Sequence, residues 1–295
     1  MRLRALAPAK VNLSLFLGGT RPEDGRHRLV TVFESLSLAD TLELELIEGA
    51  GDEVVCPGVE GENLAARALA GLRARGWDGP RVRITIAKRI PVAAGMAGGS
   101  ADAAATLRLA MAVAPGRAEE IDQIAAELGA DVPSQLLPGV ALGTGAGEIV
   151  EHFAPLAEHA FVVLPSELQL ATPDVFREAD RLGLPRSDQE LDVLYGELVA
   201  TLAPDAGLPA RLLVNDLEAA AVSLCPWCGE ALAAMRAAGA EHALVSGSGP
   251  TVVGIWWGLG AVGRAFAAAQ ELRLRYPLAL AAEPVSAEYA AASLT

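Results

Sequence analysis

The sequence predicts an α+β fold of two domains, with a functional site in the cleft between them. Segments with strand and helix patterns follow one another irregularly, without the regular strand–helix repeat of a doubly wound parallel sheet. A chain of 295 residues is long enough to bury two cores. Motifs with ligand-binding character occur in both parts, so residues 1–155 are predicted to form the N-terminal domain and residues 156–295 the C-terminal domain.

In the first half of the chain, alternation of apolar with polar or small residues predicts the strands. They span residues 11–17, 42–47 and 82–87. Helical spacing or composition predicts three helices, over residues 63–75, 100–114 and 121–128. Gly76 and Gly129 are placed to end the first and the third of them.

In the second half, the apolar run at residues 161–164 ends at Pro165, which is typical of a buried strand. Thr172-Pro173 predicts a helix start with Thr172 as N-cap and Pro173 as the first helical residue. Further helices are predicted over residues 216–224, 226–238 and 260–275, and strands over residues 242–245 and 251–257.

Composition narrows the class of protein. The formal net charge of −14 and the sequence pI of about 4.8 disfavour nucleic acid and anionic membranes as partners. Three cysteines give no disulfide framework and fit a reducing compartment, and no segment has the pattern of a signal peptide or membrane helix, so we expect a cytoplasmic protein. The pair Cys225-Pro-Trp-Cys228 could be a redox motif or half a zinc site, but a chance pair at a helix start is favoured because no second cysteine pair exists.

A segment of small residues joins a predicted strand to a predicted helix. Such residues let the backbone approach a ligand closely, and successive N–H groups at a helix N-terminus bind anions. The segment contains neither the Gly-Lys-Ser/Thr of a Walker A loop nor a G-x-G-x-x-G fingerprint. On composition alone it could also be a flexible connector. It reads Pro91-Val92-Ala93-Ala94-Gly95-Met96-Ala97-Gly98-Gly99-Ser100-Ala101.

This segment resembles the ATP loop of the GHMP kinases, in which Pro, two variable or small residues and small-Gly-hydrophobic precede a small-residue run that ends in Ser or Ala. Further blocks, spread over nearly the whole chain, resemble the 4-(cytidine 5′-diphospho)-2-C-methyl-D-erythritol kinases within that superfamily. These blocks are Pro8-Ala9-Lys10-Val11-Asn12-Leu13, Asp24-Gly25-Arg26-His27, Thr31-Val32-Phe33, Gly129-Ala130-Asp131-Val132-Pro133, Gly143–Glu148, Asn215–Glu218 and Ser246–Pro250.

The resemblance implies a two-domain GHMP kinase fold with the active site in the interdomain cleft. It implies an ATP- and Mg²⁺-dependent kinase that phosphorylates the 2-hydroxyl of a small molecule carrying cytidine diphosphate, in the non-mevalonate isoprenoid pathway, and that works as a monomer or homodimer. By resemblance Asp131 is the base and Lys10 the cation that keeps it ionised and polarises the hydroxyl, which agrees with the effect of a cation on a carboxylate. The segment of residues 91–101 is implied to bind ATP. The residues implied to bind substrate are Asn12, His27, Phe33, Thr172 and Phe176.

Simpler interpretations exist for these residues taken singly. Asp131 alone would be a cap or turn residue, and Lys10 alone a solvated lysine on an edge strand. His27 alone would be a surface histidine in a turn, and Phe176 alone a core residue. As a group, His27 and Phe33 are expected to recognise the edge and the face of the cytosine.

The chain departs from the family pattern at two positions. Tyr is common where this chain has Arg26, although a guanidinium plane can also stack on a base. An aromatic residue commonly follows Asp-Val-Pro, where this chain has Ser134. No protein carboxylate can be assigned to Mg²⁺, and Ser100 is only a weak candidate ligand.

Two other functions stay open. The chain could be a GHMP kinase for another alcohol, such as homoserine or a mevalonate derivative, but such an enzyme has no need for Asp24-Gly25-Arg26-His27 or Phe33. It could also be a catalytically silent ligand-binding paralogue, against which the presence of both Lys10 and Asp131 counts.

Overall fold

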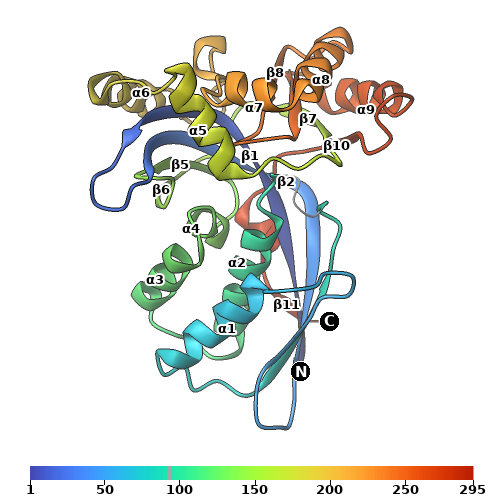
Figure 1. Ribbon diagram of the computed structural model, residues 1–295. Coiled ribbons are helices and arrows are strands. Elements are labelled where there is room, and N and C mark those ends of the chain that lie inside the picture. The colour runs from blue at the N-terminus through green and yellow to red at the C-terminus, as the bar shows by residue number, and fades with distance from the viewer. Residues whose placement is uncertain (92–94, 295) are drawn as a thin grey trace.

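Two β-sheets, each covered by helices, form the framework of the structure (Figure 1). The structure is a computed structural model that describes residues 1–91 and 95–294. The seven-stranded sheet has the order β11-β1-β2-β4-β3, with β5 paired to β2 and β6 to β5. The four-stranded sheet has the order β10-β7-β9-β8 and is antiparallel throughout. The predicted mixture of helices and sheets is therefore confirmed.

A long antiparallel hairpin, β1 (Arg2–Thr20) and β2 (His27–Leu46), runs through both parts of the molecule. The pairing shifts register between Pro8 and Lys10 and between Asn12 and Ser14. Residues 7–17 are buried throughout, because both faces of β1 are covered. Alternation predicted only residues 11–17 of this strand, since a strand covered on both faces need not alternate.

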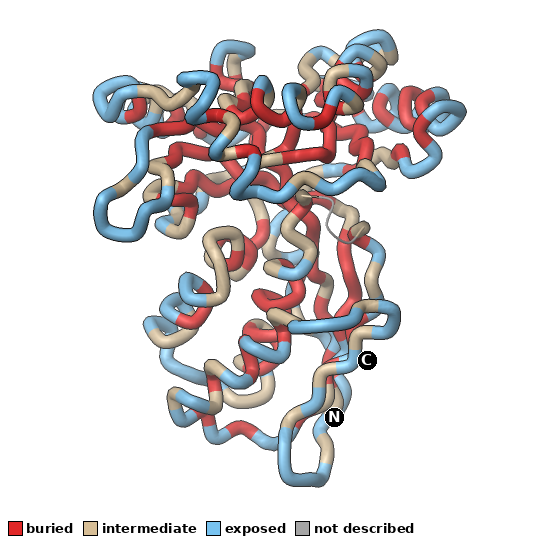
Figure 2. Tube along the Cα trace, in the orientation of Figure 1, coloured by how far each residue is buried: buried red, intermediate tan, exposed pale blue. Residues whose placement is uncertain are grey.

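Four helices lie on one side of the lower sheet in Figure 1: α1 (Leu64–Ala74), α2 (Gly98–Val113), α3 (Ala118–Leu128) and α4 (Val132–Leu136). The remaining strands of that sheet are β3 (Glu53–Val55), β4 (Val82–Ala87), β5 (Val140–Thr144), β6 (Ile149–Phe153) and β11 (Ser293–Leu294). Asn63, which was predicted to be the first helical residue, is the N-cap of α1, because its side chain accepts a hydrogen bond from the N–H of Ala65 at 2.8 Å. The alanine-rich α2 is buried on most of its surface and forms the centre of this layer (Figure 2).

The upper sheet consists of β7 (His159–Leu164), β8 (His242–Val245), β9 (Val252–Trp257) and β10 (Leu280–Ala282). Its helices are α5 (Thr172–Leu182), α6 (Asp188–Thr201), α7 (Glu218–Leu224), α8 (Pro226–Ala237) and α9 (Ala261–Leu272). No prediction covered α6, although Ser187 and Glu190 form a capping box at its start. None of the helices described is both long and apolar enough to cross a membrane.

The predicted cap of α5 is wrong by one residue. The N-cap is Ala171, and Thr172 is already helical. The hydroxyl of Thr172 is instead 3.0 Å from the hydroxyl of Ser248, so a tertiary contact replaces the local cap.

The hydrophobic core crosses the proposed domain boundary at residue 155. Leu15, Leu17 and Leu29 of the long hairpin pack in one cluster with residues of the upper helices, such as Val175. At its other end, β1 pairs with the C-terminal β11. The hairpin and the C-terminal strand therefore connect the two parts of the fold, and the division at residue 155 stays a prediction.

A buried ion pair also joins the two sheets. Nε2 of His159 on β7 lies 2.8 Å from Oε2 of Glu34 on β2, and Nδ1 donates to the carbonyl oxygen of Ala157 at 2.7 Å. Burial works to lower the pKa of His159, but the hydrogen bond and charge of Glu34 outweigh it and raise the pKa above its usual value.

Because the pKa of His159 is raised by folding, its contribution to stability is present at acidic pH, below about 6.5, and is lost as pH rises through the higher folded value. We expect His159→Gln to cost about 1–3 kcal/mol at pH 6, and less at pH 9. Urea unfolding of both proteins at several pH values measures this. A cost that does not change with pH would contradict it.

Candidate active site

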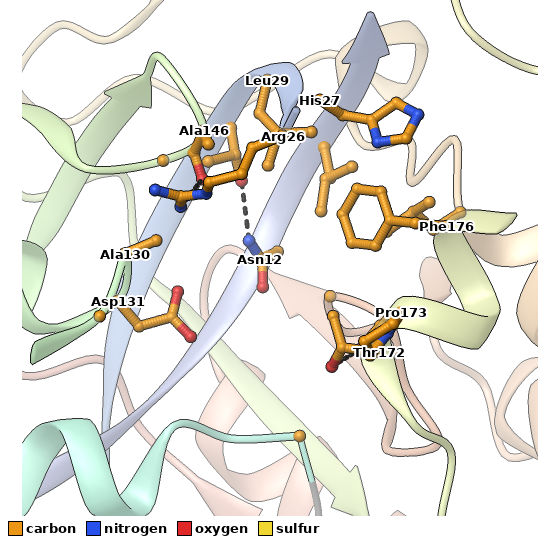
Figure 3. A pocket seen from close by; sticks show the side chains of 18 of the residues that line it. Asn12, Arg26, His27, Leu29, Ala130, Asp131, Ala146, Thr172, Pro173 and Phe176 are labelled. Atoms are coloured by element: carbon orange, nitrogen blue, oxygen red, sulfur yellow. Dashed lines mark hydrogen bonds between the residues drawn. The ribbon is translucent and has the colours of Figure 1, made fainter. Parts of the chain in front are cut away.

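A cleft of about 930 Å³ opens between the hairpin and the α3–α4 turn on one side and α5 with Gly247 and Ser248 on the other (Figure 3). All of the residues assigned to catalysis or substrate binding from the sequence line it. They are Lys10, Asn12, His27, Phe33, Asp131, Thr172 and Phe176. The structure therefore brings together residues that lie up to 166 positions apart in the chain, since Lys10 and Phe176 contribute to one site.

Lys10 is a buried cation, and only 4% of the residue is exposed. Its backbone N–H donates to the carbonyl oxygen of Met96 in the small-residue segment, at 3.3 Å. Its Nζ donates to Oδ1 of Asn12 at 2.8 Å and lies 3.4 Å from Oδ1 of Asp131. The ring of Phe33 supports the same ammonium group, with its centroid 5.0 Å from Nζ. The interpretation of Lys10 as a solvated edge lysine is therefore wrong.

Asp131 occupies the N-cap position of α4, but its side chain makes no capping hydrogen bond. The carboxylate points into the cleft instead (Figure 3), with 38% of the side chain exposed. Gly129 precedes it and ends α3, so the chain turns between two short helices at this point. The side chain is thus available both to Lys10 and to a molecule in the cleft.

Asn12 connects Lys10 to the segment that precedes β9 of the upper sheet. Its Nδ2 donates to Oγ1 of Thr31 at 2.7 Å, and its backbone N–H donates to Oγ of Ser246 at 3.2 Å. The Ser246–Pro250 segment is held in turn by Asn215, whose Nδ2 donates to the carbonyl oxygens of Val245 and Gly247, each at 2.7 Å. This network fixes Lys10 from two sides.

At the opposite end of the cleft, His27 lies against Phe176, with the ring centroids 5.1 Å apart. Nε2 of His27 is 2.8 Å from Oδ1 of Asp180 on α5. Phe33, which was expected to recognise the cytosine together with His27, lines the same cleft. Both are on β2, six residues apart, which is about 20 Å along a strand, and Phe33 packs against Lys10. The aromatic partner of His27 comes from the upper domain.

The small-residue segment leads into α2, as predicted. Val92, Ala93 and Ala94 lie outside the described residues. Ala97 is the N-cap of α2 and has a left-handed conformation, with φ 55° and ψ 32°, and no side chain caps the helix. The N–H groups of the first turn are therefore available to an anion, and no acidic residue stands in that turn.

A second hollow of about 350 Å³ lies on the other side of this segment, and Gly95 and Ala97 line both cavities. It is bounded by the start of α1, the segment itself and three charged residues, Glu62, Lys88 and Asp102. Its lining residues are Cys56, Val59, Glu62, Asn63, Leu64, Lys88, Pro91, Gly95, Met96, Ala97, Gly98, Gly99 and Asp102. The N-terminus of α2 thus stands where two cavities meet, which suits transfer of a group from one to the other.

A half-buried lysine and two buried aspartates stand beside the segment. Nζ of Lys88 donates to carboxylate oxygens of Asp40 and, at 2.7 Å, of Asp102. Oδ1 of Asp40 also accepts the N–H of Ile90 at 2.8 Å, which ties the strand end to the cluster. Burial, together with the charge of Asp40, raises the pKa of Asp102 to about 7, and Lys88 only partly opposes this.

The raised pKa of Asp102 predicts a pH effect on stability. The folded protein keeps this proton up to about pH 7, whereas the unfolded chain releases it near 4, so the contribution to stability falls as pH rises through that window. Asp102→Asn cannot ionise, so we expect its stability relative to wild type to increase by at most a few kcal/mol between pH 4 and pH 8. Parallel pH profiles of the two unfolding free energies would contradict this.

Several residues of the site were not predicted. Lys88 is one of only two lysines in the sequence, with Lys10, but no local pattern links it to Asp40 and Asp102. Asp180 lies 153 positions from His27, and nothing in its own helix marks it as a partner.

The two cysteines of the C-x-x-C pair stand at the start of α8. Cys225 is the N-cap of α8, and both thiols are buried and free. Burial, and then the neighbouring Cys225, raise the pKa of Cys228 to about 12, so its thiol stays protonated at neutral pH. The described residues hold no cluster of three or more metal-binding side chains of the His, Cys, Asp and Glu types.

Each half of the chain matches a protein-family model. A model described as the GHMP kinases N terminal domain matches residues 63–139, and one described as GHMP kinases C terminal matches residues 198–272. Together these matches cover more than half of the chain.

Curated relatives are similar over most of their length. A 4-diphosphocytidyl-2-C-methyl-D-erythritol kinase of Streptomyces coelicolor is 44% identical over 261 residues, which cover 85% of this chain and 86% of the relative. The protein of the same name from Saccharopolyspora erythraea is 46% identical, with 83% and 80% covered.

Solved structures agree in fold. A crystal structure of 4-(cytidine 5′-diphospho)-2C-methyl-D-erythritol kinase is 35% identical, covers 95% of this chain and 98% of its own, and has a TM-score of 0.75. A homoserine kinase from Cytophaga hutchinsonii has a TM-score of 0.68 at 17% identity, with 100% and 97% covered, which is similarity of fold alone.

Proposed function

The chain belongs to the 4-diphosphocytidyl-2-C-methyl-D-erythritol kinases of the GHMP family, and on this premise we propose that it transfers the γ-phosphoryl group of ATP to the 2-hydroxyl of 4-(cytidine 5′-diphospho)-2-C-methyl-D-erythritol. The product would enter the non-mevalonate route to isoprenoids. The observation that carries the proposal is the contact of 3.4 Å between Lys10 and Asp131, in a cleft that reaches the N-terminus of α2.

Asp131 is proposed to accept the proton of the substrate hydroxyl, while the hydroxyl oxygen attacks the γ-phosphorus and ADP leaves. The side chain has no capping bond to lose and points into the cleft, as a base must. Lys10 has three N–H donors, of which Asn12 accepts one and Asp131 lies within ion-pair distance. A substrate oxygen can take the remaining donor, and this cation would stabilise the charge that develops during transfer.

The donor nucleotide is proposed to lie across the segment of residues 91–101. Its phosphates would accept the N–H groups at the start of α2, and the rest of the nucleotide would occupy the hollow beside Lys88 and Asn63. ATP would bring Mg²⁺, which neutralises phosphate charge. The oxygen donors suit an ion held mainly by ATP and water, since Ser100 offers a hydroxyl at the cleft and Asp102 an oxygen without a hydrogen-bond partner at the hollow.

The cytidine is proposed to bind at the His27 and Phe176 end of the cleft. A carboxylate only accepts hydrogen bonds, so Asp180 fixes a proton on Nε2 of His27 and leaves Nδ1 of the neutral ring as an acceptor. The 4-amino group of cytosine is a matching donor, and Phe176 offers an aromatic face. Thr172 and Asn12 would complete the substrate site, and Phe33 would act by supporting Lys10.

Neither open alternative accounts for the site as well. A kinase for homoserine or a mevalonate derivative would use the α2 N-terminus and the catalytic pair, but it has no need for an aromatic, base-sized end of the cleft. A silent paralogue has no need to hold Lys10 against Asp131. A cytoplasmic location, a monomer or homodimer, and the division at residue 155 complete the proposal.

A ligand-binding measurement separates these alternatives. We expect CMP, without ATP, to raise the melting temperature, because a ligand at 100 times its Kd stabilises by about 2.7 kcal/mol. AMP should not reproduce this shift in the wild-type protein. The double variant His27→Ala, Phe176→Ala should lose the response to CMP and keep any response to ATP. A shift with homoserine or mevalonate, and none with CMP, would contradict the proposal.

A further inference from the structure

Arg26 occupies a rigid turn at the edge of the cleft. The turn joins the two long strands and is closed by hydrogen bonds from the N–H of Arg21 to the carbonyl oxygen of Arg26 at 2.7 Å and from the N–H of Gly25 to that of Arg21 at 2.9 Å. The N–H of Arg26 donates to Oδ1 of Asp24 at 3.0 Å. The backbone of Arg26 is therefore fixed, and its side chain is among those that line the cleft.

The guanidinium group of Arg26 is only weakly compensated. Its nearest contacts are the carbonyl oxygen of Ala146 at 3.4 Å and a carboxylate oxygen of Glu148 at 3.8 Å. Glu148 already has other partners. Its Oε1 accepts a hydrogen bond from Arg21 at 2.9 Å, and its Oε2, the oxygen nearer to Arg26, accepts the N–H of Ala146 at 2.7 Å. With 45% of its side chain exposed, Arg26 keeps donors for a ligand.

The other cations that line the cleft are paired more closely. Lys10 lies 3.4 Å from Asp131, and Arg177 makes an ion pair with Asp174 on α5. Among the described lining residues, Arg26 is thus the arginine or lysine with the least compensated charge. A protein with a formal net charge of −14 needs such a local cation to hold a polyanionic substrate.

The direction of the side chain distinguishes two possible roles. In Figure 3 the guanidinium group extends toward Ala146 and the side of the cleft that holds Asp131, away from His27 and Phe176. Stacking on a base held by those two rings would require it to turn toward them. We propose that Arg26 binds the diphosphate of the substrate, between the base at one end of the cleft and the reacting hydroxyl at the other.

This inference rests on the proposed function, because only a cytidine diphosphate substrate places two anionic phosphates between those ends. Arginine forms paired, charge-assisted hydrogen bonds with phosphate oxygens. At this position, where the family commonly has tyrosine, Arg26 would contact the diphosphate electrostatically in place of an aromatic contact with the base. The residue would then determine affinity for the diphosphate, not for the nucleoside.

The test compares the Kd values of cytidine and CDP by calorimetry for wild type, Arg26→Ala, Arg26→Lys and Arg26→Tyr. We expect Arg26→Ala to weaken CDP by about tenfold and to change cytidine by less than about twofold, as the loss of one partly exposed ionic contact implies. Arg26→Lys should recover part of the affinity for CDP, and Arg26→Tyr none. Arg181→Ala, which removes an arginine on α5 that pairs with Glu178 outside the cleft, is the matched control.

Equal weakening of cytidine and CDP would mean that Arg26 stacks on the base, and unchanged binding of both would mean that it serves only the turn and Glu148. Either result overturns the inference while leaving the proposed function intact. A wild-type protein that binds neither cytidine nor CDP would instead refute the proposed function itself. Melting temperatures of all variants within a few degrees of wild type would show that the turn still folds.

Discussion

Asp131→Asn should lower kcat by 10²–10⁴-fold, which corresponds to about 3–5 kcal/mol of barrier. The substitution keeps the shape of the side chain and removes the group that accepts the proton. ATP affinity should change little, because Asp131 lines the acceptor cleft and not the hollow beside Lys88. Steady-state kinetics with saturating substrates measure the effect.

The matched control for this variant is Asp122→Asn, an exposed acid near the start of α3 and outside the cleft lining, which should keep wild-type kcat. Lys10→Ala should cost a similar factor, and the double variant should lose much less than the sum of the two free energies, since the contact of 3.4 Å makes the two residues act together. A near-normal kcat for Asp131→Asn would remove its assignment as base and leave positioning and electrostatics as the source of catalysis.

Gly95→Ala should raise the KM for ATP at least tenfold and destabilise the site, because no side chain fits at this position. Gly95 has φ +74°, and a Cβ atom there would lie 2.6 Å from the carbonyl oxygen of Gly249. The strained backbone and the clash would both push the ATP segment away from the Ser246–Pro250 segment. Gly95 lines both cavities, so the displacement would disturb the proposed ATP site and the proposed substrate site together.

Gly196→Ala in α6 is the control for this substitution. A Cβ at Gly196 meets no atom within 4 Å, and alanine in a helix should stabilise by up to about 1 kcal/mol. It should leave ATP binding unchanged. If Gly95→Ala bound ATP with wild-type affinity, the segment of residues 91–101 would not be the phosphate site.

Local sequence patterns predicted most helices and strands, but they failed where burial by the rest of the fold determines an element. The strand at residues 242–245 was predicted to the residue, and the helices predicted over residues 63–75 and 226–238 agree with α1 and α8 to within one residue at each end. The strand β1 was underestimated, because burial on both faces removes alternation. The helix α6 was missed because its buried positions, Leu191 and Leu198, are too few to form a stripe.

The sequence predicted which residues line the cleft, but not which residues contact them there. Sequence blocks selected Lys10, His27 and Asp131, and each lies in the cleft. What surrounds them depends on contacts between distant segments: Asp180 orients His27 from α5, and Ser246 holds Asn12 from the upper domain. For the same reason the sequence did not predict that the ring of Phe33 supports Lys10 or that Phe176 contacts His27.

The most direct test of the account is a phosphorylation assay of the purified protein with ATP and Mg²⁺ against a panel of alcohols. The panel contains 4-(cytidine 5′-diphospho)-2-C-methyl-D-erythritol, homoserine and mevalonate. We expect phosphorylation of the first alone, at its 2-hydroxyl as located by phosphorus–carbon NMR coupling, and loss of that activity in Asp131→Asn. Turnover of homoserine or mevalonate in preference to the cytidine compound, or no turnover of any of the three, would contradict it.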